Sequence, residues 1–98
     1  MASETEIRLE ETGSGGVYVL RPEAGEAARM TFSRAGDHLI VIDHTEVPEA
    51  FRGQGIGLKL VQRAVEDARR SGRKIIPLCP FARAQFQRHP DYSDVLES

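Results

Sequence analysis

A glycine-rich segment at residues 52–58 (RGQGIGL) contains the residue types that most directly indicate chemistry. It follows an apolar run and precedes an amphipathic stretch, so it is expected to connect a strand to a helix. Glycine lets the backbone approach a ligand without a Cβ in the way. The first amides of a helix lack internal partners, and the helix dipole favours an anion beside them. The segment therefore predicts a phosphate or pyrophosphate site or, in the plainer interpretation, only a tight turn.

Two common phosphate-binding motifs do not fit this segment. A dinucleotide-binding fingerprint, Gly-x-Gly-x-x-Gly, fails when it is read from Gly53, because its last position is Leu58. A P-loop needs Gly-Lys followed by Ser or Thr, whereas Lys59 follows Leu58. The pattern that fits is Arg-x-x-Gly-x-Gly, which begins at Arg52.

The first half of the chain has the pattern of strands joined by short turns. Apolar and polar residues alternate, as in half-buried strands, at residues 7–10 and 29–33. Residues 17–20 predict another strand, which ends before Arg21 and Pro22. Residues 12–16 and 34–37 predict turns. Residues 38–47 contain the run LIVI and predict the longest strand, central in the sheet and buried on both faces. These short connections indicate an antiparallel meander.

The second half changes to a helical period. Apolar residues recur at the spacing of one helix face within an otherwise polar segment, at Leu60, Val61, Ala64, Val65 and Ala68. Gly72 predicts a left-handed cap at the end of this helix. Residues 74–78 predict a short strand parallel to the strand before the helix, residues 81–88 a short helix begun by Pro80, and residues 91–98 a frayed polar tail. The elements predict an α/β fold: a mixed, mostly antiparallel sheet of about five strands with one long and one short helix.

Composition limits the class of protein. Ninety-eight residues, 40% of them hydrophobic and 29% charged, predict a single globular domain at residues 1–98. A net charge of -2 argues against nucleic acid as a partner, and no apolar run approaches the ~18 residues of a membrane span. A single cysteine and three histidines without ligand spacing predict no disulfide and no metal. The N-terminus does not resemble a signal peptide, so a cytoplasmic location is expected.

Several segments together resemble one known family. Residues 52–57 (RGQGIG), preceded by Val47, resemble the coenzyme A pyrophosphate loop of the GNAT superfamily of N-acetyltransferases. Residues 44–48 (HTEVP), 77–81 (PLCPF) and 88–92 (RHPDY) resemble the small, single-domain branch of that superfamily. The resemblance covers residues 28–96 well and the first two strands loosely.

The resemblance implies an acetyl-CoA-dependent N-acetyltransferase that acetylates a primary amine and needs no metal. In that superfamily two strands splay apart and the pantetheine arm enters the gap, here between residues 44–47 and 75–78. The backbone of Val47 would bind the pantetheine amides. The pyrophosphate would be bound by Arg52, Gly53, Gln54, Gly55, Ile56, Gly57 and Leu58. Lys59 and Arg88 are interpreted as solvated charges rather than phosphate contacts.

Cys79 is the best catalytic candidate under this resemblance. Many superfamily members place a tyrosine acid in the last helix, and residues 81–88 contain none. Cys79 is expected at the end of the last strand and before a helix, where a thiol pKa is lowered. It would protonate the leaving thiolate or accept the acetyl group itself. The alternative is a small buried apolar residue.

His44 and Glu46 are candidates for the base. His44 is expected on the strand facing the cleft, where it would take a proton from the amine, and it is otherwise a hydrogen-bonded core histidine. Glu46 lies two residues away and is expected on the same face. It is a weaker candidate base, or a group that attracts a cationic amine.

A rival interpretation is a coenzyme A-binding or sensing module without turnover. The small size of the chain and the missing helical tyrosine favour this alternative, and Cys79 at the cleft argues against it. A nucleotide-binding protein of another kind is a weaker third hypothesis. The sequence identifies neither the amine acceptor nor the oligomeric state.

Overall fold

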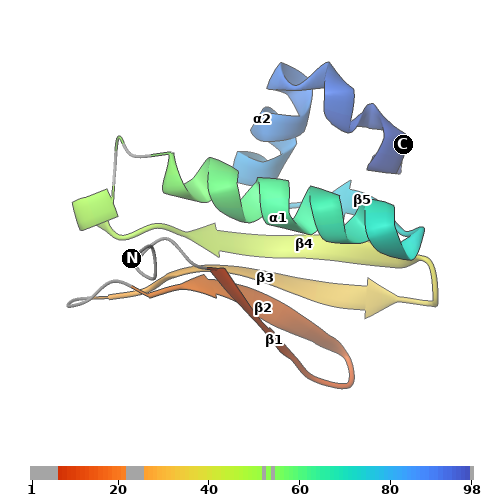
Figure 1. The fold of residues 1–98 in the computed structure, drawn as a ribbon, viewed down its shortest axis with the longest axis horizontal. Helices are drawn as coiled ribbons and strands as arrows, with labels where there is room; N and C mark the ends of the chain where they lie inside the picture. The colour runs from red at the N-terminus through yellow and green to blue at the C-terminus, as the bar shows by residue number, and fades with distance from the viewer. Residues whose placement is uncertain (1–6, 22–25, 52, 54, 98) are drawn as a thin grey trace.

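The computed structural model describes residues 7–21, 26–51, 53 and 55–97. One sheet contains five strands in the order of the chain, β1 to β5. The first four strands pair antiparallel and β4 pairs with β5 in parallel (Figure 1). The elements are β1 Ile7–Glu11, β2 Gly15–Leu20, β3 Ala28–Ala35, β4 Leu39–Glu46, η2 Glu49–Phe51, α1 Ile56–Ser71, β5 Lys74–Pro77, α2 Pro80–Arg88 and η3 Pro90–Val95. The predicted fold class is confirmed.

One face of the sheet carries the core, because alternate side chains of each strand point to the same side. Tyr18, Met30 and Ile42 are almost fully buried there and pack in one cluster with the helices. The two α-helices lie on this side of the sheet, α2 beside α1 (Figure 1). Ala82 and Phe86 of α2 join the same cluster.

Strand β4 is less buried than the sequence predicted. It lies inside the sheet, between β3 and β5, but not at its centre. Ile40 and Ile42 are buried, whereas Leu39 and Val41 are partly exposed. The prediction of burial on both faces is therefore wrong, because both helices pack on the same face.

Helix α1 follows the predicted apolar stripe, and every member of that stripe is buried. Gly72 adopts the left-handed conformation, with φ 73°, and its amide donates to the carbonyl of Ala68. This is the predicted cap, which glycine adopts without the steric cost that a Cβ brings. The helix begins at Ile56, directly after the glycine-rich turn.

The C-terminal segment is ordered, so the prediction of a frayed tail is wrong. Tyr92 and Val95 of η3 are 5% and 2% exposed and belong to the core cluster. Leu96 bridges Ile75 of β5, and the amide of Glu97 donates to the carbonyl of Ile75 at 2.9 Å. Apolar residues at 92, 95 and 96 thus cover β5, the edge strand of the sheet.

The described part of the chain contains no helix that is both long and apolar enough to cross a membrane. Within the same residues, no group of three or more His, Cys, Asp or Glu side chains is arranged to hold a metal ion.

Candidate active site

Strands β4 and β5 part at one point. They pair from Leu39 and Lys74 to Ile42 and Pro77. The amides of Leu78 and Cys79 then both donate to the carbonyl of Ile42, at 3.2 Å and 3.1 Å. Strand β4 continues to Glu46, and its register partners beyond this point lie on β3 alone. The chain after β5 turns into α2, which leaves a gap beside the end of β4.

The gap is bounded differently from the sequence prediction. Its β4 side lies at residues 44–47, as expected. Residues 75–77, however, pair with β4, so they do not form the second wall. Helix α2 forms it instead, because the chain turns at Cys79 and the helix begins at Pro80.

A cleft of about 570 Å³ occupies this gap. It lies between the end of β4, the N-terminus of α1 and one side of α2. Its walls are formed by Thr45, Val47, Phe51, Gly53, Gly55, Ile56, Gly57, Leu58, Phe81, Gln85 and Arg88. The structure therefore brings Val47 and most of the predicted glycine-rich turn into one cleft. Arg52 and Gln54, also predicted there, lie outside the described residues.

The glycine-rich turn needs glycine for two different reasons. Gly53 and Gly55 have φ angles of 82° and 71°, which disfavour any residue with a Cβ. A Cβ at either position would nevertheless meet no atom within 4 Å. Gly57 lies inside the helix, and a Cβ there would come within 2.5 Å of the Phe81 ring. The turn is thus open around Gly55 and closely covered by Phe81 at Gly57.

The N-terminus of α1 is suited to bind an anion. Gly55 is its N-cap, no side chain caps it, and its first turn carries no acidic residue. The first amides are therefore free to bind an anion, which the helix dipole also favours. Arg88 adds a cation to the same cleft, whereas Lys59 is not among the cleft-lining residues. Arg88 thus lies at the cleft, and its contact with a phosphate stays a prediction.

Cys79 lies at the point where the strands part. It is the N-cap of α2 and only 4% exposed, and its Sγ is 3.4 Å from Thr45 Oγ1. Burial raises the pKa of this thiol, but hydrogen bonds from Thr45 and from the amides of Ala82 and Phe81 outweigh it and lower the pKa below its usual value. Thr45 lines the cleft, and Cys79 lies directly behind it.

His44 and Glu46 lie together, but they do not face the cleft. Nε2 of His44 is 3.5 Å from Oε2 of Glu46, and their side chains are 65% and 63% exposed. The expectation that His44 faces the cleft is wrong, because β4 contains a bulge at Asp43. Thr31 pairs with His44 while Phe32 pairs with Ile42, so Asp43 is an extra residue that reverses the alternation.

Thr45 and Gln85 are functional candidates that the sequence interpretation missed. Thr45 precedes Val47 by two residues, so strand alternation alone would place both on one face. Gln85 follows Phe81 by four residues, which is the spacing of one helix face. Both spacings are visible in the sequence. They point to the cleft only once it is known that Val47 and Phe81 line it.

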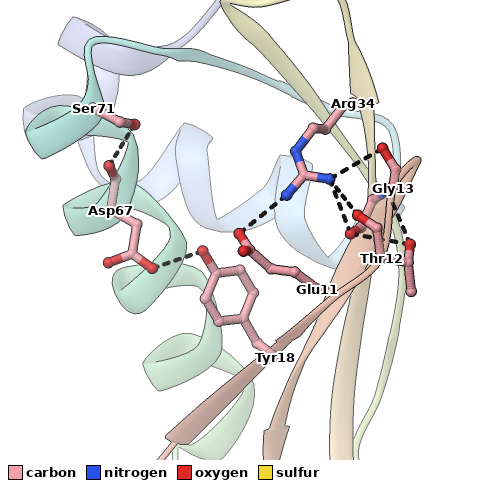
Figure 2. Close-up of polar contacts among 8 residues, drawn as sticks. Glu11, Thr12, Gly13, Tyr18, Arg34, Asp67 and Ser71 are labelled. Carbon is pink, nitrogen blue, oxygen red and sulfur yellow. Dashed lines mark hydrogen bonds and ion pairs between the residues drawn. The ribbon is translucent and has the colours of Figure 1, made fainter.

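A second hollow of about 360 Å³ lies away from this site, between the sheet and the C-terminal half of α1. Figure 2 shows its polar groups bonding one another: the Tyr18 hydroxyl donates to Asp67 at 2.8 Å. Arg63 and Arg70 also pair with Asp67. Burial, then the hydrogen bond to Asp67, raises the pKa of Tyr18 well above its usual value. Tyr18, Arg63 and Arg70 therefore bond to Asp67 within the protein, and we interpret this group as stabilising the fold.

Comparison with known proteins agrees with the geometry of the cleft. The family model described as GCN5-related N-acetyl-transferase matches residues 17–95. The NMR solution structure of a "GCN5-like putative N-acetyltransferase" from Staphylococcus aureus is similar, with a TM-score of 0.78 and 32% identity, covering 100% of this chain and 92% of that chain. No curated protein matches the chain at a significant level. The match extends from the second strand through the glycine-rich turn to the ordered C-terminal segment, and the chain belongs to the GCN5-related N-acetyltransferase family.

Proposed function

We propose that the chain transfers an acetyl group from acetyl-CoA to a primary amine. One observation supports this above the others: a single cleft joins the free N-terminus of α1 to the point where β4 and β5 part. A ligand that carries an anion at one end and a thioester at the end of an extended arm matches both features.

The residues of the cleft suit the parts of acetyl-CoA. The amides around Gly55 and the Arg88 guanidinium suit the phosphates, because both present positive charge to the same space. The backbone of Val47 suits the amides of the pantetheine arm, since β4 has no strand partner on this side beyond Ile42. Aliphatic and aromatic side chains around the arm, such as Phe51 and Phe81, suit its methylene groups.

The reaction makes an N–C bond and breaks the C–S bond of the thioester. A neutral amine attacks the carbonyl and loses a proton. The coenzyme A thiolate leaves and takes up a proton. In the direct version, Cys79 gives its proton to that thiolate. In the covalent version, the Cys79 thiolate first takes the acetyl group, and coenzyme A leaves as its thiolate, which takes a proton from water. The amine then attacks the acetyl-cysteine, loses a proton to water and releases the Cys79 thiolate.

The lowered pKa of Cys79 favours the covalent version, because a thiolate is the nucleophilic form. Thr45 serves either version: its hydroxyl accepts from the thiol or, after rotation, donates to the thiolate. His44 and Glu46 stand on the opposite face of β4. They are proposed to receive the amine proton through water as the acceptor approaches from that side.

The rival function is a coenzyme A-binding or sensing protein without turnover. One observation favours it: Cys79 is 4% exposed and is not among the residues that line the cleft. A thiol screened by Thr45 would have to become accessible during a covalent reaction. The acceptor amine, the cytoplasmic location and the extent of the domain stay predictions.

Two measurements separate these functions. Coenzyme A should raise the melting temperature under both, because a ligand that binds only the native state stabilises it. Thiol release from acetyl-CoA should depend on an added amine only if the chain is a transferase. A panel of amino sugars, polyamines, small metabolite amines and lysine peptides tests this. Coenzyme A stabilisation without amine-dependent release from any of them would favour the binding module, and no stabilisation would refute both.

A further inference from the structure

Helix α2 presents three chemically different side chains to the cleft. Phe81, Gln85 and Arg88 all line it, and their spacing of four and three residues places them along one face of the helix. Ala82 and Phe86 point instead into the core. The wall is thus aromatic near the turn of α1, polar in its middle and cationic at its far end.

The polar residue in the middle is buried. Gln85 is 7% exposed and is the buried polar side chain of the described residues. Its backbone is satisfied, because its carbonyl accepts from the amide of His89 at 3.0 Å. Its side-chain amide makes no hydrogen bond within the described part of the chain. A side-chain amide that is mostly withdrawn from water and has no partner in the protein is one that a ligand can satisfy.

The amide of Gln85 opens into the cleft. Among the described residues, no fully enclosed side-chain nitrogen or oxygen is left without a partner. Gln85 lines the cleft and its amide bonds to no described residue, so the cleft is the space from which a partner would reach it. Thr45 of β4 and Val47, just beyond the strand, line the same cleft.

We propose that Gln85 binds an amide of the pantetheine arm of the cosubstrate, an inference that rests on the proposed function. A carboxamide presents N–H donors and a carbonyl acceptor, which match the carbonyl and N–H of a second amide. The phosphates have charged partners elsewhere, at the N-terminus of α1 and at Arg88. A neutral amide on the helix face between Phe81 and Arg88 fits the neutral, amide-bearing part of the ligand.

The test uses Gln85→Met, which keeps the length of the side chain and its helix propensity but removes the amide. Gln87→Met is the matched control, because Gln87 is exposed on the same helix and is not among the cleft-lining residues. Calorimetry measures the binding of coenzyme A and of 3′-phosphoadenosine 5′-diphosphate, which has the phosphates but no pantetheine arm. The melting temperature without ligand measures the fold.

Gln85→Met should weaken coenzyme A binding about three- to tenfold, the range for one neutral hydrogen bond. Binding of the truncated nucleotide should not change, and Gln87→Met should change neither. The melting temperature of Gln85→Met without ligand should stay close to that of the parent, because the amide makes no hydrogen bond to a described residue that the substitution would break. If Gln85→Met does not fold, Gln85→Leu tests the same point, since it removes the amide without adding a charge.

An equal loss of affinity for both ligands would overturn the proposal, as would unchanged coenzyme A binding. A melting temperature well below that of Gln87→Met would also overturn it, because Gln85 would then act through the fold. If the parent chain binds neither ligand, the proposed function itself fails. If the parent binds coenzyme A and Gln85→Met binds it equally well, only the role of Gln85 is refuted.

Discussion

The replacement of Gly55 by aspartate is the sharpest test of the anion site at the N-terminus of α1. Gly55 is the N-cap, and a Cβ there would meet no atom within 4 Å. The side chain would therefore find open space beside the cleft that Gly55 lines. Gly55→Asn is the matched control, because asparagine has nearly the same shape and tolerance of positive φ but no charge.

Both variants carry the same backbone penalty. The φ of 71° at this position costs a residue with a Cβ about 1 kcal/mol. An aspartate cap does not offset this, since capping side chains need an extended backbone. The melting temperature of each variant should fall by roughly 4–8 °C for a domain of this size.

The charge should separate the two variants in ligand binding. Two unit charges about 6 Å apart repel by roughly 3 kcal/mol at an effective dielectric constant of about 20. Screening by water in an open cleft reduces this to about 2–3 kcal/mol, which corresponds to a ~30- to ~150-fold loss of affinity. Gly55→Asn should lose only a few-fold.

Isothermal titration of each variant with coenzyme A measures this difference, at low and high salt. High salt should narrow the gap between the variants, because screening weakens the repulsion between charges. Equal affinities of Gly55→Asp and Gly55→Asn would refute the assignment of this turn as the pyrophosphate site, whatever their stabilities.

Three further predictions concern other parts of the molecule. Cys79→Ala should lower turnover by at least ~10² and leave coenzyme A binding nearly intact. In the parent protein, the rate of Cys79 alkylation should reach half its maximum at a lower pH than for free cysteine. If the covalent version holds, the intact mass of the parent should show an acetyl adduct after exposure to acetyl-CoA without an acceptor amine. His44→Gln should leave coenzyme A affinity unchanged, because His44 faces away from the cleft, but should lower turnover if His44 receives the amine proton; unchanged turnover would count against His44 as the base. Tyr18→Phe should lower the free energy of unfolding, measured by chemical denaturation, by about 1–2 kcal/mol. It removes a hydrogen bond to the charged Asp67, which still pairs with Arg63 in the variant. A loss below ~0.5 kcal/mol would contradict this.

The sequence by itself determined the local elements. The stripe in α1 and its cap at Gly72 follow from short-range spacing and from the positive φ that glycine tolerates. The turn at residues 52–57 was identifiable for the same reason, since its chemistry lies in one continuous segment. Strand positions in the first half followed from alternation, although their ends shifted by one or two residues.

The tertiary structure decided which side of β4 faces the cleft. A bulge at Asp43 exists only in the pairing of β4 with β3, so it cannot be derived from the alternation within one strand. That single extra residue turns His44 and Glu46 outward and Thr45 toward Cys79. The four consecutive polar residues at 43–46 show no alternation that would mark the extra residue.

The tertiary structure also decided the second wall of the cleft and the state of the C-terminal segment. The amphipathic pattern of α2 is short, and it does not indicate whether Gln85 faces the core or a cavity. Tyr92 and Val95 become buried, and Leu96 partly buried, because η3 packs against α1 and α2 and the segment bridges the free side of β5. Burial of these residues depends on contacts between segments distant in the chain, and such contacts are set by the packed fold rather than by local sequence.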